Sequence, residues 1–221
     1  MTTAILIPAR MASTRFPNKP LAMLHGIPMI ERVYERCAKT GLDVYVLTDS
    51  LEIANYVPNV IVTDPAENGT ERCMQVIDNH LQYDRYINVQ GDMPDITPEI
   101  IRAVEAELQH SDVATAYTAM DFNLRSDPNC VKMIHSRGRA HWFCRAALQY
   151  GDHHLGIYGY NREAKVMYNV SKKFPEEDIE KLEQLRWIQN GIKLGVVEVE
   201  FNGIEINTPG DLEEWYNRNG K

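Results

Sequence analysis

Apolar and polar positions along this 221-residue chain follow two different periods. Short continuous apolar runs predict buried strands, and apolar residues three or four positions apart predict helices. In the first half, the runs predict strands at 4–9, 44–48, 59–63, 86–90 and 112–120. Helices are predicted between them, at 28–39, 51–56, 70–81 and 97–110. Strands that alternate with helices of this length predict an α/β fold with a mostly parallel sheet flanked by helices.

The second half has a less regular pattern. Two short runs near 130–135 and 139–143 predict a small antiparallel insert, and strands are expected at 154–160 and 193–201. A helix is predicted over 178–189. Thr208 followed by Pro209 is typical of a helix start, which predicts a terminal helix. Because no repeat or Pro/Gly/Ser-rich linker interrupts the chain, we expect a single domain over 1–221.

Charge is unevenly distributed along the chain. The whole sequence has 23 basic and 31 acidic residues, a formal net charge of −8. The first 30 residues contain Arg10, Arg15 and Lys19 but no acid. An acidic protein does not favour nucleic acid or an anionic membrane surface as a partner. The acid-free beginning therefore indicates a local site for a small anion.

Two further observations concern the cellular compartment. The longest apolar runs are much shorter than the roughly 20 residues that span a bilayer, and no signal-peptide pattern opens the chain. Four scattered cysteines, without a C-x-x-C pair, are typical of free thiols in a reducing compartment. We therefore expect a cytoplasmic protein.

The loop after the first predicted strand concentrates positive charge. It reads I-P-A-R-M-A-S-T-R-F-P-N-K-P over 7–20 and lies at a strand's carboxyl end, where sheets of this kind bind ligands. Three cations with backbone N–H groups could surround a triphosphate. The loop is neither a Walker sequence nor G-x-G-x-x-G. A solvated basic loop is the alternative interpretation.

Two other short segments could carry chemistry. Asp92, in V-Q-G-D-M-P, follows the fourth predicted strand and could hold Mg²⁺ that bridges phosphates, although Gly-Asp is also ordinary turn sequence. In the segment 68–72, N-G-T-E-R, Thr70 could cap the helix, but Arg72 does not suit that end of a helix dipole. The histidines at 153 and 154 are, on their own, more typical of surface or core positions than of ligands. No H-E-x-x-H or G-x-S-x-G motif is present.

Taken in order, these segments resemble one enzyme family. The first motif is followed by G-T-E-R, V-Q-G-D-x-P, H-L-G-I-Y-G-Y at 154–160, L-E-Q-L-R at 182–186 and N-T-P-x-D-L at 207–212. This succession is similar to that of the 3-deoxy-manno-octulosonate (Kdo) cytidylyltransferases, or CMP-Kdo synthetases. The similarity runs from residue 4 to about 216, and its most specific part is the H-L-G-I-Y and L-E-Q-L-R pair.

The resemblance implies a nucleotide-sugar transferase fold of Rossmann-like type. It implies a nucleotide-binding half over 1–120, a sugar-binding and dimerisation part over 121–205, and a terminal helix over 206–221. It implies transfer of CMP from CTP to the anomeric hydroxyl of Kdo with Mg²⁺ as cofactor, by a homodimer. Such a product would belong to lipopolysaccharide or capsule synthesis.

The resemblance also implies roles for individual residues. Catalysis would depend on Arg10, Lys19 and Asp92, and CTP would be bound by Arg10, Arg15, Lys19, Asn68, Gly69 and Arg72. The acidic sugar would be bound by Gln90, Arg145, His154, Tyr158, Glu183 and Gln184. Asp92 and the residue at 207 would hold the metal.

The sequence departs from the family pattern at several positions. The family's D-T-P-x-D-L begins here with Asn207, so the second metal carboxylate is replaced by an amide. Met93 replaces a usual Glu, and Asn68 a usual Ser. The stretch between Arg145 and His154 is shorter than in most relatives. Two alternatives therefore stay open: transfer to another acidic sugar, such as an amino-Kdo or a nonulosonate, or a non-catalytic nucleotide- or sugar-binding relative.

Overall fold

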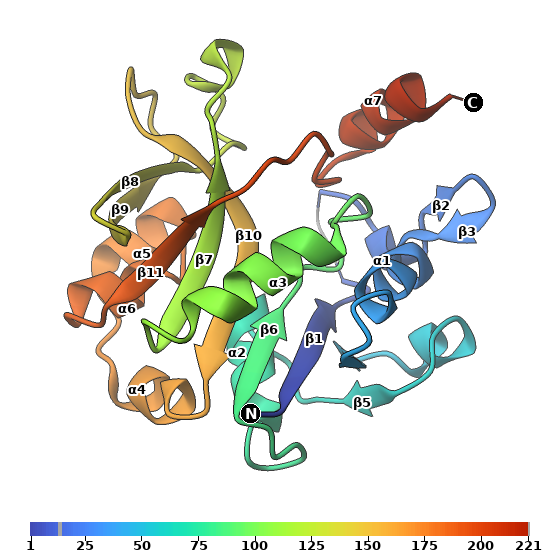
Figure 1. Cartoon of the computed structure of the whole chain (residues 1–221). Coiled ribbons are helices and arrows are strands. Elements are labelled where there is room, and N and C mark those ends of the chain that lie inside the picture. Colours follow the sequence, from blue (N-terminus) through green and yellow to red (C-terminus); the bar gives the residue numbers. More distant parts are fainter. Residues whose placement is uncertain (13–14, 221) are drawn as a thin grey trace.

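The computed structural model describes residues 1–12 and 15–220, so Ser13 and Thr14 of the first motif lie outside the described residues. Its centre is a nine-stranded sheet with the strand order β5-β4-β1-β6-β10-β7-β11-β9-β8 (Figure 1). The bounds of these strands are β1 Thr3–Ala9, β4 Asp43–Thr48, β5 Val60–Val62, β6 Arg85–Asn88, β7 Val113–Thr118, β8 Lys132–Ser136, β9 Arg139–Cys144, β10 Asp152–Asn161 and β11 Leu194–Glu198. A separate small hairpin pairs β2 (Met23–Leu24) with β3 (Ile27–Pro28).

The sheet is mixed, which corrects the prediction of a mostly parallel sheet. Strands β5, β4, β1 and β6 are parallel to one another, and β11 is parallel to β7. Strand β10, however, runs antiparallel between β6 and β7. The expected antiparallel pair β8 and β9 is present, but it extends the main sheet at its edge. Because β10 continues past the end of β6, Gly156 in the middle of β10 lies beside Gln90, close to the loop that contains Asp92.

Helices cover both faces of the sheet, as predicted (Figure 1). Their bounds are α1 Met29–Ala38, α2 Gly69–Val76, α3 Pro98–Glu107, α4 Ala164–Val170, α5 Pro175–Glu180, α6 Leu185–Gln189 and α7 Pro209–Asn219, with short 3₁₀ turns at Lys19–Leu21, Leu51–Asn55 and Phe122–Leu124. The helix starts at Thr97 and Thr208 are confirmed, since each threonine side chain accepts a backbone N–H of the first turn.

Two predicted helices differ from the structure more than the others do. The helix predicted over 70–81 ends at Val76, and Asp78 then adopts a left-handed backbone with φ 64°. The helix predicted over 178–189 is divided into α5 and α6, because Lys181 between them is also left-handed, with φ 56°. The two pieces are held together by Arg186, whose guanidinium donates to both oxygens of the buried Glu177 carboxylate at 2.9 and 2.6 Å. The break places Glu183 and Gln184 on a short connection.

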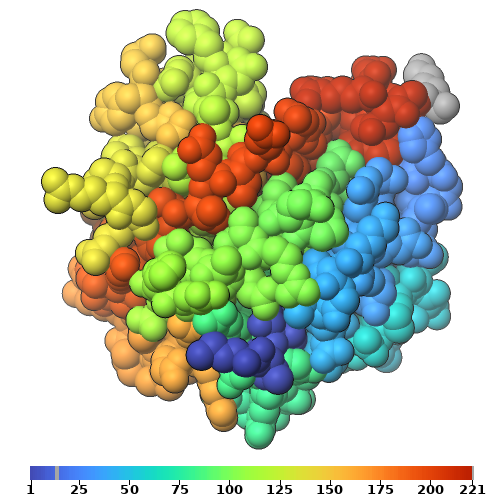
Figure 2. All heavy atoms as spheres, in the orientation of Figure 1, coloured from blue at the N-terminus to red at the C-terminus, as the bar shows by residue number. Residues whose placement is uncertain are grey.

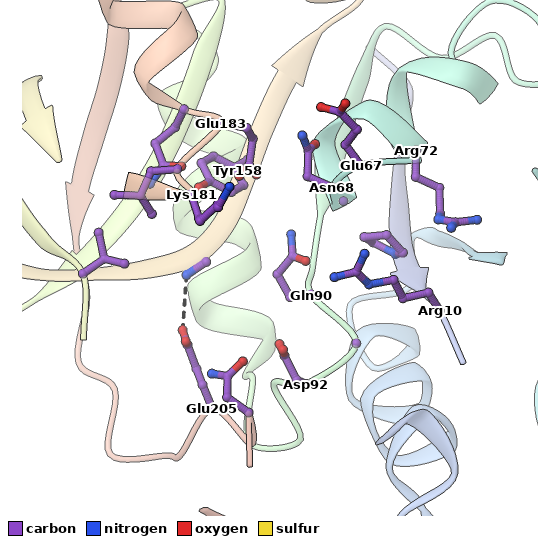
Figure 3. A pocket seen from close by; sticks show the side chains of 18 of the residues that line it. Arg10, Glu67, Asn68, Arg72, Gln90, Asp92, Tyr158, Lys181, Glu183 and Glu205 are labelled. Carbon is purple, nitrogen blue, oxygen red and sulfur yellow. Dashed lines mark hydrogen bonds between the residues drawn. The ribbon is translucent and has the colours of Figure 1, made fainter. Parts of the chain in front are cut away.

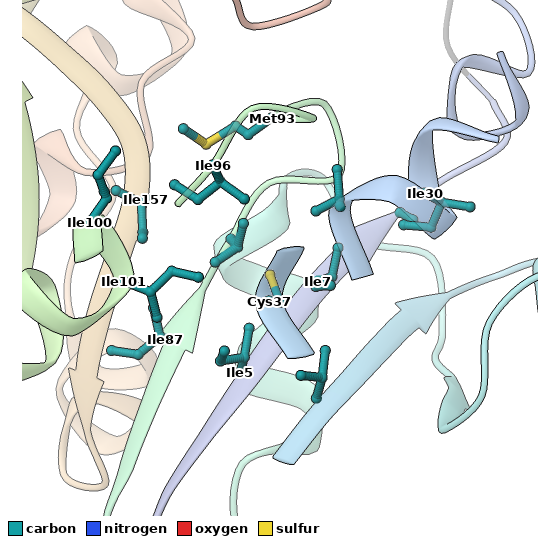
Figure 4. Packing of buried hydrophobic residues seen from close by; sticks show 14 of the residues in the cluster. Ile5, Ile7, Ile30, Cys37, Ile87, Met93, Ile96, Ile100, Ile101 and Ile157 are labelled. Carbon is teal, nitrogen blue, oxygen red and sulfur yellow. The ribbon is translucent and has the colours of Figure 1, made fainter. Parts of the chain in front are cut away.

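Two apolar clusters sandwich the sheet. Along β1, Ile5 and Ile7 belong to the cluster under α1, α3 and α7, while Leu6 belongs to the cluster on the other face (Figure 4). This alternation is the two-residue period of a strand buried on both faces. Met93, which departs from the family pattern, is fully buried in the first cluster, so it is a core residue.

All four cysteines are free thiols, as predicted from their spacing, and the structure shows that all four are buried. Cys37 packs in the first apolar cluster and Cys73 in the second. Burial raises the pKa of both thiols, and it raises the pKa of Cys130 to about 12. Within residues 1–12 and 15–220, none of the helices is both long and apolar enough to cross a bilayer.

The segment after β11 crosses the outside of the molecule to reach the first half, where α7 packs (Figures 1 and 2). The backbone N–H of Ile206 donates to the Asp92 carbonyl at 2.9 Å. Asp95 accepts the Trp215 indole N–H at 2.9 Å and the Ile204 N–H at 3.4 Å. These contacts attach the crossing segment to the loop after β6.

Candidate active site

One cavity of about 820 Å³ opens at the carboxyl ends of β1 and β6 and beside the beginning of β10. In Figure 3, Arg10, Asn68 and Arg72 lie on one side of it, Tyr158, Lys181 and Glu183 on the other, and Gln90 between them. All fourteen residues predicted for the site line this cavity: Arg10, Arg15, Lys19, Asn68, Gly69, Arg72, Gln90, Asp92, Arg145, His154, Tyr158, Glu183, Gln184 and Asn207. The structure therefore brings the predicted residues together.

The basic loop forms one wall of the cavity. Arg10 and Arg15 are exposed at its mouth. Lys19 begins a 3₁₀ turn, and its ammonium donates to Asp92 Oδ2 at 2.6 Å. Both side chains of this ion pair are about one-fifth exposed, at 18% and 20%. The pair thus places the site's best-buried phosphate-binding candidate against its metal-binding candidate.

The beginning of α2 forms a second part of the wall. Asn68 caps this helix, since its side-chain oxygen accepts the Glu71 N–H at 2.8 Å, so the predicted cap at Thr70 is wrong. The Thr70 hydroxyl instead donates to Glu183 Oε1 at 2.9 Å. Asn68 can cap as well as the usual Ser, because both side chains carry a suitable acceptor oxygen.

Gly69 lies where a side chain would not fit. A Cβ built there would be 2.9 Å from Gln90 Oε1 and 3.0 Å from Pro8 Cγ. We expect Gly69→Ala to displace Gln90 and to raise the KM for CTP about tenfold, with about 1 kcal/mol of destabilisation. Steady-state kinetics and urea unfolding measure the two effects. Gly41→Ala, which is strained by its left-handed backbone but lies outside the cavity, controls for loss of stability alone. Unchanged KM in Gly69→Ala would contradict the prediction.

Arg72 lines the cavity but is also part of the protein's own framework. It is only 3% exposed, its guanidinium donates to Asp49 Oδ2 at 2.8 Å, and it also donates to the Thr63 hydroxyl. A buried guanidinium needs such partners because isolated burial of a charge is costly. Arg72 therefore joins the loops after β4 and β5 to α2.

A hydrogen-bonded chain runs beneath the cavity from one wall to the other. Gln90 Nε2 donates to Asn88 Oδ1 at 3.1 Å, and Asn88 Nδ2 donates to the Tyr160 hydroxyl at 3.2 Å. That hydroxyl is 3.0 Å from the Thr70 hydroxyl, which reaches Glu183. The chain sets the orientation of the Gln90 amide, so its Oε1 is turned away from Asn88. It also ties α2 to the connection between α5 and α6.

Arg145 is held by backbone carbonyls. Its Nε donates to the Glu180 carbonyl at 3.0 Å, and its Nη1 donates to the Pro128 carbonyl at 3.0 Å. The ammonium of the fully buried Lys132 donates to the Arg145 carbonyl at 3.3 Å. These contacts fix Arg145 in place, and they already use two of its three guanidinium nitrogens.

His154 is buried and neutral. Burial, reinforced by the positive charge of Arg145 and by His153, lowers its pKa to about 3. Its Nε2 is 2.9 Å from the Thr115 hydroxyl, which itself donates to the Ile157 carbonyl at 2.7 Å. Because a hydroxyl has a single proton to donate, His154 Nε2 donates to Thr115. The other nitrogen, Nδ1, is then an acceptor.

The low pKa of His154 predicts a loss of stability in acid. The unfolded imidazole takes up a proton near pH 6.5, but the folded one does so only near 3, so the stabilisation is complete above 6.5 and declines below it. We expect the His154 contribution to the free energy of unfolding to fall by about 2 kcal/mol between pH 7 and pH 5. In His154→Gln, urea unfolding at the two pH values should show a correspondingly smaller difference. An equal difference in His154→Gln and in the exposed control His110→Gln would contradict this.

Two residues of the sugar-side wall are almost fully buried. The Tyr158 ring lies parallel to Tyr160, with 8° between the ring planes. Gln184 is 1% exposed, and its Oε1 has no hydrogen-bond partner among the described residues. An unpaired buried acceptor is costly, so it indicates a position for a ligand donor.

The sequence analysis missed a buried acid beside Asp92. Glu205 lines the cavity beside Asp92 (Figure 3), and its Oε1 accepts the Gly156 N–H at 3.3 Å. Burial, reinforced by the negative charge of Asp92, raises the pKa of Glu205 to about 7. An acid two residues before N-T-P was visible in the sequence, but nothing local distinguished it from other acids. Lys181, Asn129 and Glu67 also line the cavity and were not predicted.

Comparisons with known proteins bear on this site. A family model described as cytidylyltransferase matches residues 4–194. The 3-deoxy-manno-octulosonate cytidylyltransferase of Bartonella henselae is 39% identical over 230 residues, which cover 95% of both chains. The chain belongs to the 3-deoxy-manno-octulosonate cytidylyltransferase family. A second relative of this name, from Hydrogenovibrio crunogenus, is 38% identical over 238 residues and 96% of each chain.

Comparison with solved structures supports the same family assignment. A structure of CMP:2-keto-3-deoxy-manno-octonic acid synthetase complexed with CTP has a TM-score of 0.89 and 33% identity, over 97% of this chain and 96% of that chain. A glucose-1-phosphate thymidylyltransferase from Bacillus anthracis shares the fold, with a TM-score of 0.73 and 14% identity. The expected nucleotidyltransferase fold is thus confirmed in its overall architecture.

Proposed function

We propose that this cytidylyltransferase transfers CMP from CTP to the anomeric hydroxyl of Kdo and releases pyrophosphate. The observation that carries the proposal is one cavity in which a basic loop faces a wall of polar, partly unpaired side chains. A nucleoside triphosphate and an acidic sugar must bind side by side in one cavity for the transfer to occur. Members of this family are named for that reaction.

The nucleotide is assigned to the first-half wall. Arg10, Arg15 and Lys19 would neutralise the triphosphate, whose charge increases on the leaving pyrophosphate as the reaction proceeds. Asn68 and Gly69 would contact the cytidine from the beginning of α2, and Arg72 would support them from behind. Because Arg72 is held in an ion pair with Asp49, it would position the beginning of α2 in addition to any contact that it makes with the cytidine.

The acidic sugar is assigned to the second-half wall. Gln90, Tyr158, Glu183 and Gln184 offer donors and acceptors for its hydroxyls, and the Gln184 oxygen lacks a protein partner. His154 Nδ1 would accept a hydrogen bond from a sugar hydroxyl, because Nε2 donates to Thr115.

Arg145 is assigned to the sugar carboxylate. Its guanidinium would use the nitrogen that the backbone carbonyls leave, Nη2, so the contact would be one-sided, unlike the bidentate pairing that arginine often makes.

Mg²⁺ is proposed as the cofactor, held by Asp92 with Asn207 beside it. The donor set fits a hard cation, because carboxylate and amide oxygens on one wall suit Mg²⁺ and phosphate oxygens can complete its ligands. When bound, Mg²⁺ would neutralise phosphate charge and acidify a sugar hydroxyl. The protein's own contribution is to orient the hydroxyl oxygen toward the α-phosphorus and to stabilise the charge that leaves with pyrophosphate.

Pyrophosphate release tests the proposed function. The protein is incubated with CTP, Mg²⁺ and one acidic sugar at a time: Kdo, 8-amino-Kdo or a nonulosonate. Release with Kdo is the expected result. Release with another acid only would identify a different acceptor. That outcome is kept open because the Hydrogenovibrio relative contains segments that this chain lacks, since their alignment spans 238 positions and this chain has 221 residues. CTP binding without release for any acid would contradict catalysis.

We also propose a homodimer that forms through the second half, in the cytoplasm, with a product used for lipopolysaccharide or capsule synthesis. Three apolar side chains of the second half support an interface there: Val166, Val170 and Ile179 are 62%, 79% and 77% exposed. Light scattering measures the mass in solution, and a monomer at micromolar concentration would contradict the dimer.

A further inference from the structure

Glu205 and Asn207 occupy equivalent places on the segment that crosses to α7. Ile206 between them is fully buried, while Glu205 and Asn207 both line the cavity. This alternation is that of an extended chain, in which residues two apart point to the same side. The Ile206 N–H bond to the Asp92 carbonyl fixes the segment against the loop of Asp92.

A carboxylate at position 205 can therefore reach the same part of the cavity as a carboxylate at position 207. A shift of two residues moves the backbone position by about 7 Å along an extended chain. The glutamate side chain is one methylene longer than aspartate, and it recovers part of that distance. In Figure 3 the side chains of Glu205 and Asp92 lie at the same end of the cavity.

The charges around Glu205 point to a cation. Glu205 and Asp92 are two acids that line the cavity, and the ammonium of Lys19 pairs with Asp92. Among the described residues, the Glu205 carboxylate accepts one hydrogen bond, from the Gly156 N–H. Among the described residues, no three Asp, Glu, His or Cys side chains converge on one point. A cation here would have two protein carboxylates and would take its remaining oxygens from elsewhere, which is the usual arrangement for Mg²⁺ bound with substrate phosphates.

We propose that Glu205, with Asp92, is the second carboxylate of the divalent-cation site, so the negative charge that the family has at 207 has moved to 205. The inference rests on the proposed function for the presence of a cation with CTP. Asn207 then contributes at most a neutral oxygen, and the site keeps the net charge of a two-carboxylate centre.

Mn²⁺ is the probe for this proposal. Its binding to the protein with CTP, and without any sugar, is followed by the electron paramagnetic resonance signal of free Mn²⁺. We expect Glu205→Gln to weaken Mn²⁺ binding at least tenfold, because the charge is lost while the amide oxygen can still accept the Gly156 N–H. Glu205→Asp should give an intermediate loss. Glu200→Gln, an exposed acid nearby that does not line the cavity, is the matched control and should bind like the parent.

The decisive variant moves the carboxylate from position 205 to position 207. In Glu205→Gln combined with Asn207→Asp, the carboxylate returns to 207, and Mn²⁺ affinity should recover to within about threefold of the parent. Affinity within twofold of the parent in Glu205→Gln, or a double variant as weak as the single one, would overturn the proposal. If Mn²⁺ binding responds as expected but no sugar releases pyrophosphate, the metal assignment stands and the proposed reaction fails.

Discussion

Replacing Lys19 with methionine is expected to lower kcat/KM for CTP by about a thousandfold. Removal of one group that stabilises developing charge costs this much in other enzymes, roughly 4 kcal/mol. Lys19 is the least exposed cation of the basic loop, and its contact with Asp92 holds it at the cavity wall. Arg10 and Arg15 are exposed at the mouth, so each is expected to contribute less.

Three observations separate this effect from misfolding. The Lys19–Asp92 pair is partly exposed, so its loss should change the free energy of unfolding by no more than about 1 kcal/mol. Lys19→Arg keeps the charge and should recover part of the rate. The exposed Lys39, at the end of α1, provides a control, and Lys39→Met should be as active as the parent. Activity of Lys19→Met within threefold of the parent would remove Lys19 from the reaction.

Replacing Asp92 with asparagine is the second large change. We expect kcat to fall about a hundredfold to a thousandfold, and the Mg²⁺ concentration for half-maximal rate to rise at least tenfold. The amide keeps the shape of the side chain but loses a charge at a metal–oxygen contact. Lys19 also loses its anionic partner, which leaves its ammonium free for phosphate. The affinity for CTP alone, without metal, should therefore stay equal or increase.

Pyrophosphate release over a series of Mg²⁺ concentrations measures this prediction. Asp121→Asn is a suitable control, because Asp121 is exposed, lies outside the cavity and caps a 3₁₀ turn that asparagine can also cap. An Asp92→Asn variant with lower kcat but unchanged Mg²⁺ dependence would exclude Asp92 as a metal ligand. It would leave Asp92 only the task of positioning Lys19.

Local sequence predicted the elements better than their directions. The apolar runs of β1 and β6 and the threonine start of α3 depend on neighbouring residues, and these predictions agree with the structure. Strand β10 was found, but its antiparallel direction depends on the whole connection from β7, which no local period encodes. The helix over 178–189 was predicted as continuous because its apolar spacing is regular, yet Ile179 faces outward and the left-handed Lys181 breaks the helix.

The site was predictable where motifs carry the chemistry. All fourteen residues taken from the family resemblance line one cavity, although their roles stay predictions. Thr70 was misread as a cap because its true partners, Tyr160 and Glu183, lie far away in the chain. Glu205 was missed for the same physical reason. Its importance comes from its nearness to Asp92, which only the crossing segment creates.

The four buried thiols can serve as natural probes of local unfolding. A buried cysteine with a raised pKa is protected from thiol reagents, since the thiolate is the reactive form and the reagent must also reach it. Cys37 lies under one face of the sheet and Cys73 under the other. The rate at which each is labelled therefore measures how often its own layer separates from the sheet. Labelling with a thiol reagent, followed by mass spectrometry, can compare the local opening of the two layers with and without CTP, and the protein needs no substitution for this.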